Sequence, residues 1–288
     1  MKNKTFLFIG GDLRQITAAN TLSKSVNACV YGFDNHVSER FDRSVVALEN
    51  IDNIDFVDYI VLPLPYSLVK NQINCPYFER KIYVTDVISK AKHQKIFAGK
   101  ADDFLKSIAQ ENQVIDYLER EEFAVLNAIP TAEGAIKIAI DETSGTLNNA
   151  NCLVLGYGRI GRVLTGILQG FGAKTTVFAR KPKDFAYLKA LGVNFGGYKE
   201  LKDKAKDADI IFNTVPQKVI DYEVLNNLDK DALVIDLASK PGGVDFDSAK
   251  ILGKKVIWAL SLPGKIAPKT AGEIIAETLS NIINELEV

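Results

Sequence analysis

Short apolar runs alternate with amphipathic segments along all 288 residues of the chain. Five runs before residue 100 predict β-strands: TFLFIG, ACVYGF, DYIVLPLP, KIYVTD and KIFAG. Five more after residue 150 predict a second set: NCLVLGYG, KTTVFAR, DIIFNTVP, ALVIDLAS and KVIWALSLPG. Buried strands that alternate with helices are typical of parallel sheets covered by helices on both faces. The pattern therefore predicts an α/β protein with two Rossmann-like, doubly wound domains and a cleft between them.

A helical segment separates the two sets of strands. Residues 126–145 carry apolar side chains at helical spacing, and Pro130 is suited to a helix start. The last segment, KTAGEIIAETLSNIINEL, also has helical periodicity. We expect an N-terminal substrate or partner domain over 1–125, joined by the C-terminal helix 270–288, a helical connector over 126–145, and an NADP-binding Rossmann domain over 146–269. The closing helix is expected to run back to the N-terminal domain and tie the two halves together.

The stretch NCLVLGYGRIGRVLTG holds Gly156, Gly158 and Gly161 in the GxGxxG spacing between a predicted strand and a predicted helix. In a dinucleotide site the first glycine permits a tight turn, the second lets backbone approach the pyrophosphate, and the third lets helix and strand pack closely. The helix start adds N–H groups that suit a diphosphate. The alternative is a tight turn whose glycines only ease packing.

The N-terminal stretch FIGGDLRQ is a poorer match to this motif. It has Gly10 and Gly11, but Asp12 would place a carboxylate near any diphosphate. This strand and turn are better suited to a domain that frames a substrate. Arg14 either pairs with a substrate carboxylate or is an ordinary surface arginine, and the sequence does not separate the two.

The segment VFARKPKD indicates which nicotinamide cofactor is used. An NAD enzyme usually has an acidic residue at the end of the second strand, where it binds the ribose 2′-hydroxyl. Here Ala179 stands in that region, and Arg180 and Lys181 offer positive charge for a 2′-phosphate. NADP is therefore favoured, although the two cations could simply begin a basic loop. The predicted cofactor-binding residues are Gly156, Gly158, Arg159, Ile160, Gly161, Arg180, Lys181, Thr214, Val215 and Pro216.

Several loops are expected beyond the carboxyl ends of the strands, where ligands bind in open α/β sheets. They are NTVP, DLASKPGG, LSLPGKIAPKTAG and the connector segment NAIPTAEGA. Each could be an ordinary turn, and it is their expected convergence that suggests a site. The predicted catalytic residues are Lys240, Lys265 and Glu133, with Asp236 as another available proton carrier; the predicted substrate residues are Arg14, Thr131, Ser239, Lys240 and Lys265. The chain has only His36 and His93, and neither stands beside a carboxylate in an obvious pair.

Composition excludes several other classes of function. A net charge of −1 with dispersed basic residues offers no nucleic-acid footprint. No apolar run is expected to reach the roughly 20 residues that span a bilayer, so we expect no membrane partner. Cys29, Cys75 and Cys152 lack metal-ligand or disulfide spacing, so no metal is expected. The simple interpretation is a cytoplasmic protein, with a homo-oligomer left open.

The segments GYGRIG, DLASKPGGVDF and LPGKIAPKTAGEII resemble the A subunit of dipicolinate synthase from spore-forming bacteria, and the resemblance extends over nearly the whole chain. It implies a cytoplasmic enzyme of the sporulating mother cell that acts with a flavoprotein-like B subunit. It also implies synthesis of pyridine-2,6-dicarboxylate from a dihydro or hydroxytetrahydro precursor in the lysine pathway, with NADP as a fitting acceptor. The resemblance does not assign the catalytic residues.

Two alternatives remain open. The chain could be a noncatalytic partner that binds a nucleotide while another subunit performs the chemistry, as the lack of an evident acid–base histidine allows. It could also be an amino-acid or hydroxy-acid dehydrogenase with the same two-domain plan.

Overall fold

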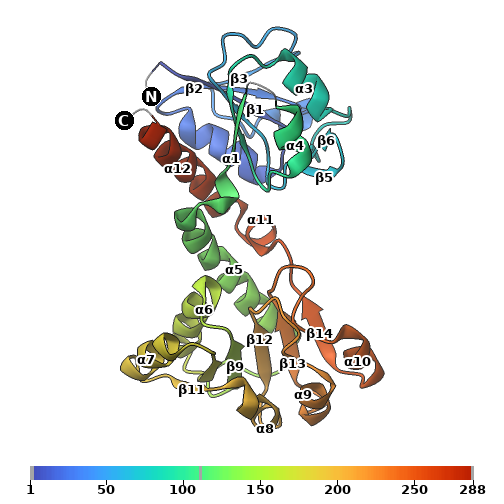
Figure 1. Ribbon diagram of the computed structural model, residues 1–288, viewed down its shortest axis with the longest axis vertical. Helices are drawn as coiled ribbons and strands as arrows, with labels where there is room; N and C mark the ends of the chain where they lie inside the picture. The colour runs from blue at the N-terminus through green and yellow to red at the C-terminus, as the bar shows by residue number, and fades with distance from the viewer. Residues whose placement is uncertain (1–2, 110–111, 287–288) are drawn as a thin grey trace. The chain divides into compact units, whose positions relative to one another are not determined.

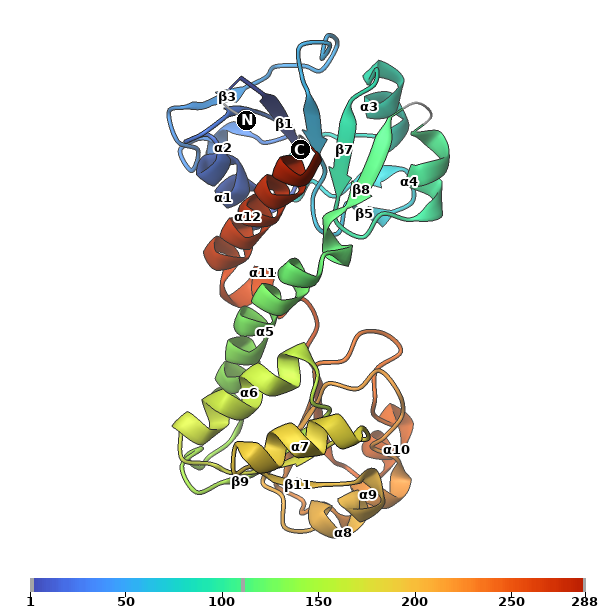
Figure 2. The same ribbon diagram turned by 60° about the vertical axis from the view of Figure 1, so that its left-hand side comes forward.

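The computed structural model describes residues 3–109 and 112–286. The chain divides into two compact units, which are drawn in Figures 1 and 2. Unit 1 comprises Met1–Asn127 and Ala267–Val288, and unit 2 comprises Ala128–Ile266. Each unit is built around one six-stranded parallel sheet, so the prediction of two Rossmann-like α/β folds is confirmed.

The main sheet of unit 1 has the strand order β3-β2-β1-β4-β7-β8, with every pair parallel. Counted along the sheet's own strands, this is the 3-2-1-4-5-6 order of the Rossmann fold. The order reverses between β1 and β4, which is where ligands bind in such sheets. The strands are β1 (Thr5–Ile9), β2 (Asn27–Tyr31), β3 (Val45–Ala47), β4 (Tyr59–Val61), β7 (Lys95–Ala98) and β8 (Gln113–Asp116).

The last helix of the chain belongs to unit 1. Helix α12 (Pro268–Leu286) lies alongside α1 (Leu13–Leu22), as Figures 1 and 2 both show. Gly272 makes this close approach possible, because a Cβ there would lie 2.5 Å from the backbone oxygen of Arg14. The final two residues of the predicted closing helix, 287 and 288, lie outside the described residues.

The remaining elements of unit 1 are short. A two-stranded hairpin, β5 with β6, interrupts the alternation of strands and helices. Its bounds and those of the other elements are β5 (Ser67–Val69), β6 (Gln72–Ile73), α2 (Asn35–Ser38), α3 (Val84–Lys90), α4 (Asp103–Ile108) and η1 (Tyr117–Glu119).

The sheet of unit 2 repeats the same topology in the order β11-β10-β9-β12-β13-β14. Alternate residues of its first strand face opposite sides: Cys152 and Val154 pack into one core cluster, Leu153 and Leu155 into another. Burial on both faces explains why the central strands of this sheet are mostly apolar. The strands are β9 (Asn151–Leu155), β10 (Lys174–Phe178), β11 (Asn194–Gly196), β12 (Ile210–Asn213), β13 (Leu233–Asp236) and β14 (Lys255–Trp258).

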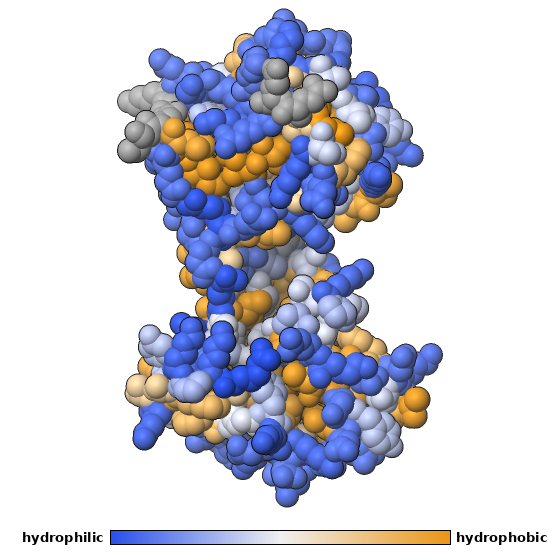
Figure 3. All heavy atoms as spheres, viewed as in Figure 1, coloured by the Kyte–Doolittle hydropathy of each residue, from blue (hydrophilic) through white to orange (hydrophobic). Residues whose placement is uncertain are grey.

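Helices follow most strands of unit 2. Figure 3 shows a surface that is mainly polar, with apolar patches between the polar side chains. The helices are α6 (Arg159–Gly170), α7 (Pro182–Ala190), η2 (Tyr198–Glu200), α8 (Leu201–Ala205), α9 (Tyr222–Asn227), α10 (Phe246–Ile251) and α11 (Leu262–Ile266).

Helix α5 (Glu121–Glu142) corrects two predictions. It begins at Glu121, and Pro130 lies inside it and is buried. A proline in mid-helix removes one backbone hydrogen bond and is uncommon there, which is why the sequence pattern places a helix start at this residue. The helix is also long and apolar enough to cross a membrane, contrary to prediction. However, its residues Ala132, Ala135 and Ala139 are fully buried in the core of unit 2, as in the core helix of a globular domain.

Two other predictions of secondary structure were wrong. The run KIYVTD is not a strand of the main sheet: Tyr83 forms one isolated bridge with Gln72, and α3 begins at Val84. The segment expected to be a loop before the closing helix contains a short helix of its own, α11, formed by LPGKI. The edge strands β3, β8 and β11 were not predicted at all.

Candidate nucleotide-binding site

The turn from β9 to α6 is built around Gly156. Its φ of +95° lies in a region that favours glycine. A Cβ here would lie 2.4 Å from the Oγ1 atom of Thr214, the first residue after β12. Thr214 Oγ1 donates in turn to the carbonyl of Leu155 at 2.8 Å. Thr214 thus packs the loop after β12 against the glycine turn, at the point where the strand order of unit 2 reverses.

The other two glycines of the motif have contrasting surroundings. A Cβ at Gly161 would lie 2.2 Å from the backbone oxygen of Gly156, so only glycine lets α6 approach the turn this closely. A Cβ at Gly158 would meet nothing within 4 Å. Gly158 is exposed and caps the N-terminus of α6, an end that carries unsatisfied N–H groups and a partial positive charge. This helix N-terminus is therefore unobstructed at Gly158, as the approach of a diphosphate would require.

The corresponding turn of unit 1 is filled by its own chain. A Cβ at Gly10 would lie 2.2 Å from the sulfur of Cys75, and the Gly11 N–H donates to the carbonyl of Asn74 at 2.8 Å. Burial raises the pKa of the Cys75 thiol to about 12, so this thiol stays neutral at physiological pH. The segment Asn74–Cys75 therefore occupies the place where a phosphate would approach.

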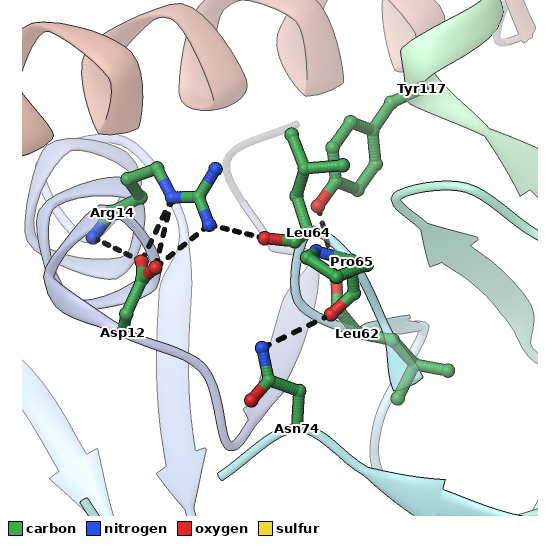
Figure 4. Close-up of polar contacts among 7 residues, drawn as sticks. All are labelled: Asp12, Arg14, Leu62, Leu64, Pro65, Asn74 and Tyr117. Carbon is green, nitrogen blue, oxygen red and sulfur yellow. Dashed lines mark hydrogen bonds and ion pairs between the residues drawn. The ribbon is translucent and has the colours of Figure 1, made fainter. Parts of the chain in front are cut away.

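Figure 4 shows that Arg14 is engaged within unit 1. Its Nε and Nη2 atoms donate to the carboxylate of Asp12 at distances of 2.7–3.1 Å, and Nη2 also donates to the carbonyl of Leu64. Only 12% of the Arg14 side chain is exposed. Asp12 also caps α1 by accepting from the Arg14 N–H. Arg14 is therefore not a solvated surface residue, and most of its donors are committed to the protein.

The loop that Arg14 contacts is held at two further carbonyls. Tyr117 donates from its hydroxyl to the carbonyl of Leu62 at 3.2 Å, and Asn74 donates to Pro65 at 3.4 Å (Figure 4). Burial raises the pKa of Tyr117, which keeps its hydroxyl a donor. Side chains from three different parts of unit 1 thus fix the loop after β4.

The end of β10 lacks an acidic residue. Ala179 is buried, and Arg180 next to it is exposed and donates from Nη1 to Oε1 of Gln217 at 3.2 Å. Lys181 is exposed at the N-cap of α7. The first acid that follows, Asp184, is buried and forms an ion pair with Arg162 at 3.7 Å. The charge available at this strand end is therefore positive.

Two residues near this strand end were not predicted from the sequence. Gln217 orients the guanidinium of Arg180 and lies just after the predicted NTVP segment. The guanidinium of Arg162 stacks on the rings of Tyr157 and Tyr187, with centroid distances of 5.2 and 5.3 Å. For Arg162, the sequence offered one indication of a role near the site: it stands directly after the last glycine of the motif.

A buried polar pair joins the loops that follow β12 and β13. Asn213 and Asp236 end these strands, have zero exposure, and are linked by a hydrogen bond of 2.8 Å from Asn213 Nδ2 to Asp236 Oδ1. Asp236 also accepts from the N–H groups of Ala238 and Gly243 at 3.1 and 2.8 Å. This carboxylate has no access to solvent, and its three hydrogen bonds hold the ends of the two loops together.

The predicted catalytic lysines lie on two neighbouring connections of unit 2. Ser239 and Lys240 are exposed in the loop after β13, and Lys265 is exposed on α11, after β14. Since β13 and β14 are adjacent and parallel, both connections leave the same edge of the sheet. That edge is also where the glycine turn lies.

Thr131 and Glu133 lie in the middle of α5 instead of at a helix start. Glu133 is exposed, and its neighbour Gly134 packs against α11: a Cβ there would lie 3.0 Å from Leu262 Cβ and 3.3 Å from Ile266 Cγ1. The middle of α5 therefore lies beside the helix that carries Lys265.

A hollow of about 650 Å³ opens elsewhere in unit 2, at the amino ends of its strands. Its lining includes Asp209, Asp229, Lys230 and Lys255. It lies at the opposite edge of the sheet from the glycine turn. Among residues 3–109 and 112–286, no group of three His, Cys, Asp or Glu side chains could hold a metal ion.

Comparison with known proteins agrees with the two-unit architecture. Residues 5–118 match the family model of the N-terminal domain of the dipicolinate synthase A subunit, and residues 131–245 match that of the D-isomer specific 2-hydroxyacid dehydrogenase NAD-binding domain. Together with the open glycine turn, these matches define an oxidoreductase that depends on a nicotinamide dinucleotide, NAD or NADP.

Relatives along the whole chain make the family explicit. The chain is 34% identical to the A subunit of dipicolinate synthase from Bacillus subtilis (strain 168), over 97% of its own length and 95% of that protein. Crystal structures of the A subunits of dipicolinate synthase from Bacillus subtilis and Bacillus halodurans superpose with TM-scores of 0.90 and 0.88, each at 32% identity. The alignments cover 100% and 97% of this chain, and 98% and 97% of the respective structures. The chain belongs to the family of dipicolinate synthase A subunits.

Proposed function

We propose that this chain is the NADP-dependent subunit of a dipicolinate synthase, which oxidises a dihydrodipicolinate-type precursor to pyridine-2,6-dicarboxylate. The observation that carries the proposal is the open space at Gly158 beside a close-packed Gly156–Gly161 turn, within a chain whose relatives are dipicolinate synthase A subunits. A flavoprotein-like B subunit would complete the enzyme. The site of action would be the cytoplasm of the sporulating mother cell.

The residues present suit a nicotinamide dinucleotide. The pyrophosphate would bind at Gly158 and the first turn of α6, which contains Arg159, Ile160 and Gly161. The ribose would lie against the loop after β12, formed by Thr214, Val215 and Pro216. Arg180 and Lys181 would bind a 2′-phosphate, since β10 ends without a carboxylate that would repel it. Gln217 supports this assignment because it already holds Arg180 by its guanidinium.

The chemistry needs a hydride acceptor and a proton acceptor. When bound, the oxidised nicotinamide accepts the hydride removed from the dihydropyridine ring. The ring becomes aromatic once it has lost a proton as well as the hydride. This proton must pass to a side chain or to water. Glu133 is the proposed proton acceptor, because Lys240 and Lys265 are needed as cations that pair with the substrate. Asp236 is not a candidate, because its carboxylate is fully buried and engaged.

The substrate would carry two carboxylates, which need cationic partners once they leave water. Lys240 and Lys265 follow adjacent parallel strands, so we assign one carboxylate to each, with Ser239 and Thr131 as hydrogen-bonding neighbours. Arg14 is the next candidate, although Asp12 already offsets its charge.

The direct test is to incubate the purified chain with the dihydro precursor and NADP⁺, with and without the B subunit. NADPH absorbance and dipicolinate should rise together, and NAD⁺ should be the weaker acceptor. Binding of NADPH without turnover under either condition would instead support a noncatalytic nucleotide-binding subunit. Oxidation of a hydroxy acid or amino acid in place of the precursor would support a related dehydrogenase.

A further inference from the structure

The hydrogen bond between Asn213 and Asp236 joins the two loops that, under the proposed function, surround the nicotinamide end of the cofactor. We infer that this pair positions both loops as one unit, and so sets cofactor affinity without contacting the cofactor. The inference rests on the proposed function for the identity of the ligand. It concerns positioning residues and adds no catalytic group.

On the β12 side, Asn213 uses its whole amide to shape the loop that follows. Its Oδ1 accepts from the Val215 N–H at 3.1 Å, and its Nδ2 donates to the Val215 carbonyl at 3.0 Å. Both polar groups of Val215 are thus turned towards the strand end. This contact fixes the backbone of Thr214 and Val215, next to the glycine turn.

On the β13 side, Asp236 shapes the loop that carries Ser239 and Lys240. Its two oxygens accept from Ala238 and Gly243, so both ends of the loop are held by one carboxylate. Trp258 adds a bond from Nε1 to the Ala238 carbonyl at 2.9 Å. The position of Lys240 therefore depends on Asp236.

The two halves of this network cannot shift independently. A Cβ at Gly243 would lie 2.1 Å from Asn213 Nδ2 and 2.4 Å from the Val215 oxygen, so the two loops are in direct contact. The Gly243 carbonyl also accepts from the N–H groups of Val219 and Ile220 at 3.0 Å each. The loops behave as a single packed layer above the strand ends.

Full burial of a polar side chain is unfavourable for folding unless hydrogen bonds compensate for the lost water. The partners of Asp236 are three N–H donors, and none of them belongs to a cation. Positioning of a ligand site explains why an amide and a carboxylate stand here.

The test measures NADPH affinity by fluorescence titration in Asp236→Asn and Asn213→Ser. Leu225→Ala serves as the matched control, because Leu225 is fully buried on α9 and takes no part in the network. Unfolding midpoints of all variants are measured in the same buffer. We expect at least a tenfold weaker affinity in both network variants, and less than a twofold change in the control at a comparable loss of stability.

A third variant, Gly243→Ala, displaces Asn213 from the backbone side and should also weaken NADPH binding tenfold, which keeps the test usable where one polar variant does not fold. If wild-type protein binds NADPH and the folded network variants bind it equally well, positioning by this pair is wrong. If wild-type protein binds no nicotinamide nucleotide, it is the proposed function that fails. Equal weakening in Leu225→Ala would assign the effect to stability alone and overturn the inference.

Discussion

Gly161 lies so close beneath Gly156 that a methyl group on it would stand 2.2 Å from the Gly156 carbonyl oxygen. Gly158, between them in sequence, faces open space. Packing therefore requires glycine at position 161 but not at position 158. This contrast separates the effect of the fold from the effect of the ligand.

The first prediction uses this contrast. Gly158→Val should leave the unfolding midpoint nearly unchanged but weaken NADPH binding by at least about tenfold, or roughly 1.4 kcal/mol, because its side chain enters the space in front of α6. Gly161→Ala should instead destabilise the protein by about 1–3 kcal/mol through overpacking. Thermal unfolding and NADPH titration measure the two effects. An unchanged affinity in Gly158→Val would move the cofactor elsewhere.

The second prediction concerns the choice between NADP and NAD. Arg180→Asp should repel the 2′-phosphate and accept a hydrogen bond from the ribose hydroxyl of NAD, so the ratio of affinities should shift towards NAD. Lys189→Asp makes the same change of charge at the exposed end of α7 and is the control. Should both variants keep the wild-type ratio, Arg180 does not select the cofactor.

The third prediction concerns the two lysines beyond β13 and β14. Lys240→Ala and Lys265→Ala should each impair use of the substrate by about 2–5 kcal/mol, the range for one partner of a desolvated charge pair, with NADPH affinity preserved. Lys250→Ala, an exposed residue on α10, should have almost no effect. Separate kcat and KM values test this, and normal kinetics in both site variants would leave Arg14, Thr131 and Glu133 as the next candidates.

The fourth prediction concerns Arg14. Arg14→Ala removes the donors of Asp12 and of the Leu64 carbonyl, so the free energy of unfolding should fall by about 1–3 kcal/mol. Arg120→Ala offers a comparison, since it removes an arginine whose ion-pair partners are more exposed. Denaturant titration compares the two, and an equal or smaller loss for Arg14→Ala would contradict a structural role for its contacts.

The fifth prediction concerns stability at acid pH. Arg120 donates to Glu285 at 2.6 Å, and this hydrogen bond lowers the pKa of Glu285 below its ordinary value of 4.5. A carboxyl with a lowered folded pKa stabilises the protein above its unfolded pKa, and the contribution is lost as pH falls towards the folded pKa. Glu285→Gln should therefore lose less stability than wild type between about pH 5 and about pH 3. Parallel acid dependence of the two proteins would show that the pair contributes nothing.

Much of the sheet architecture could be predicted from the sequence because central parallel strands are buried on both faces. In the run NCLVL, every residue after Asn151 is apolar and buried for that reason. Edge strands escape this rule: Val46 in β3 is 56% exposed and Phe195 in β11 is 39% exposed. The run KIYVTD resembles a strand because the β-branched Ile82 and Val84 stand at alternate positions. Both side chains are buried, but beside the start of α3 rather than in the sheet.

The candidate site was predictable where one segment contains the whole signal. Gly156, Gly158 and Gly161 belong to one turn, so their spacing alone suggests their separate roles. The contact of Arg180 with Gln217 joins residues 37 positions apart, and that of Asn213 with Asp236 joins residues 23 apart. Such pairs depend on which strands are neighbours, and single-residue patterns contain no information about that.

The filled turn of unit 1 has a consequence for stoichiometry. Two sheets of identical strand order would suggest two nucleotides per chain, yet Asn74 and Cys75 occupy the first turn. Calorimetric titration should therefore saturate at one molar equivalent of NADPH. In unit 1 the chain's own residues take the place of a phosphate ligand, so we expect the Rossmann strand order there to serve as a scaffold rather than as a second cofactor site.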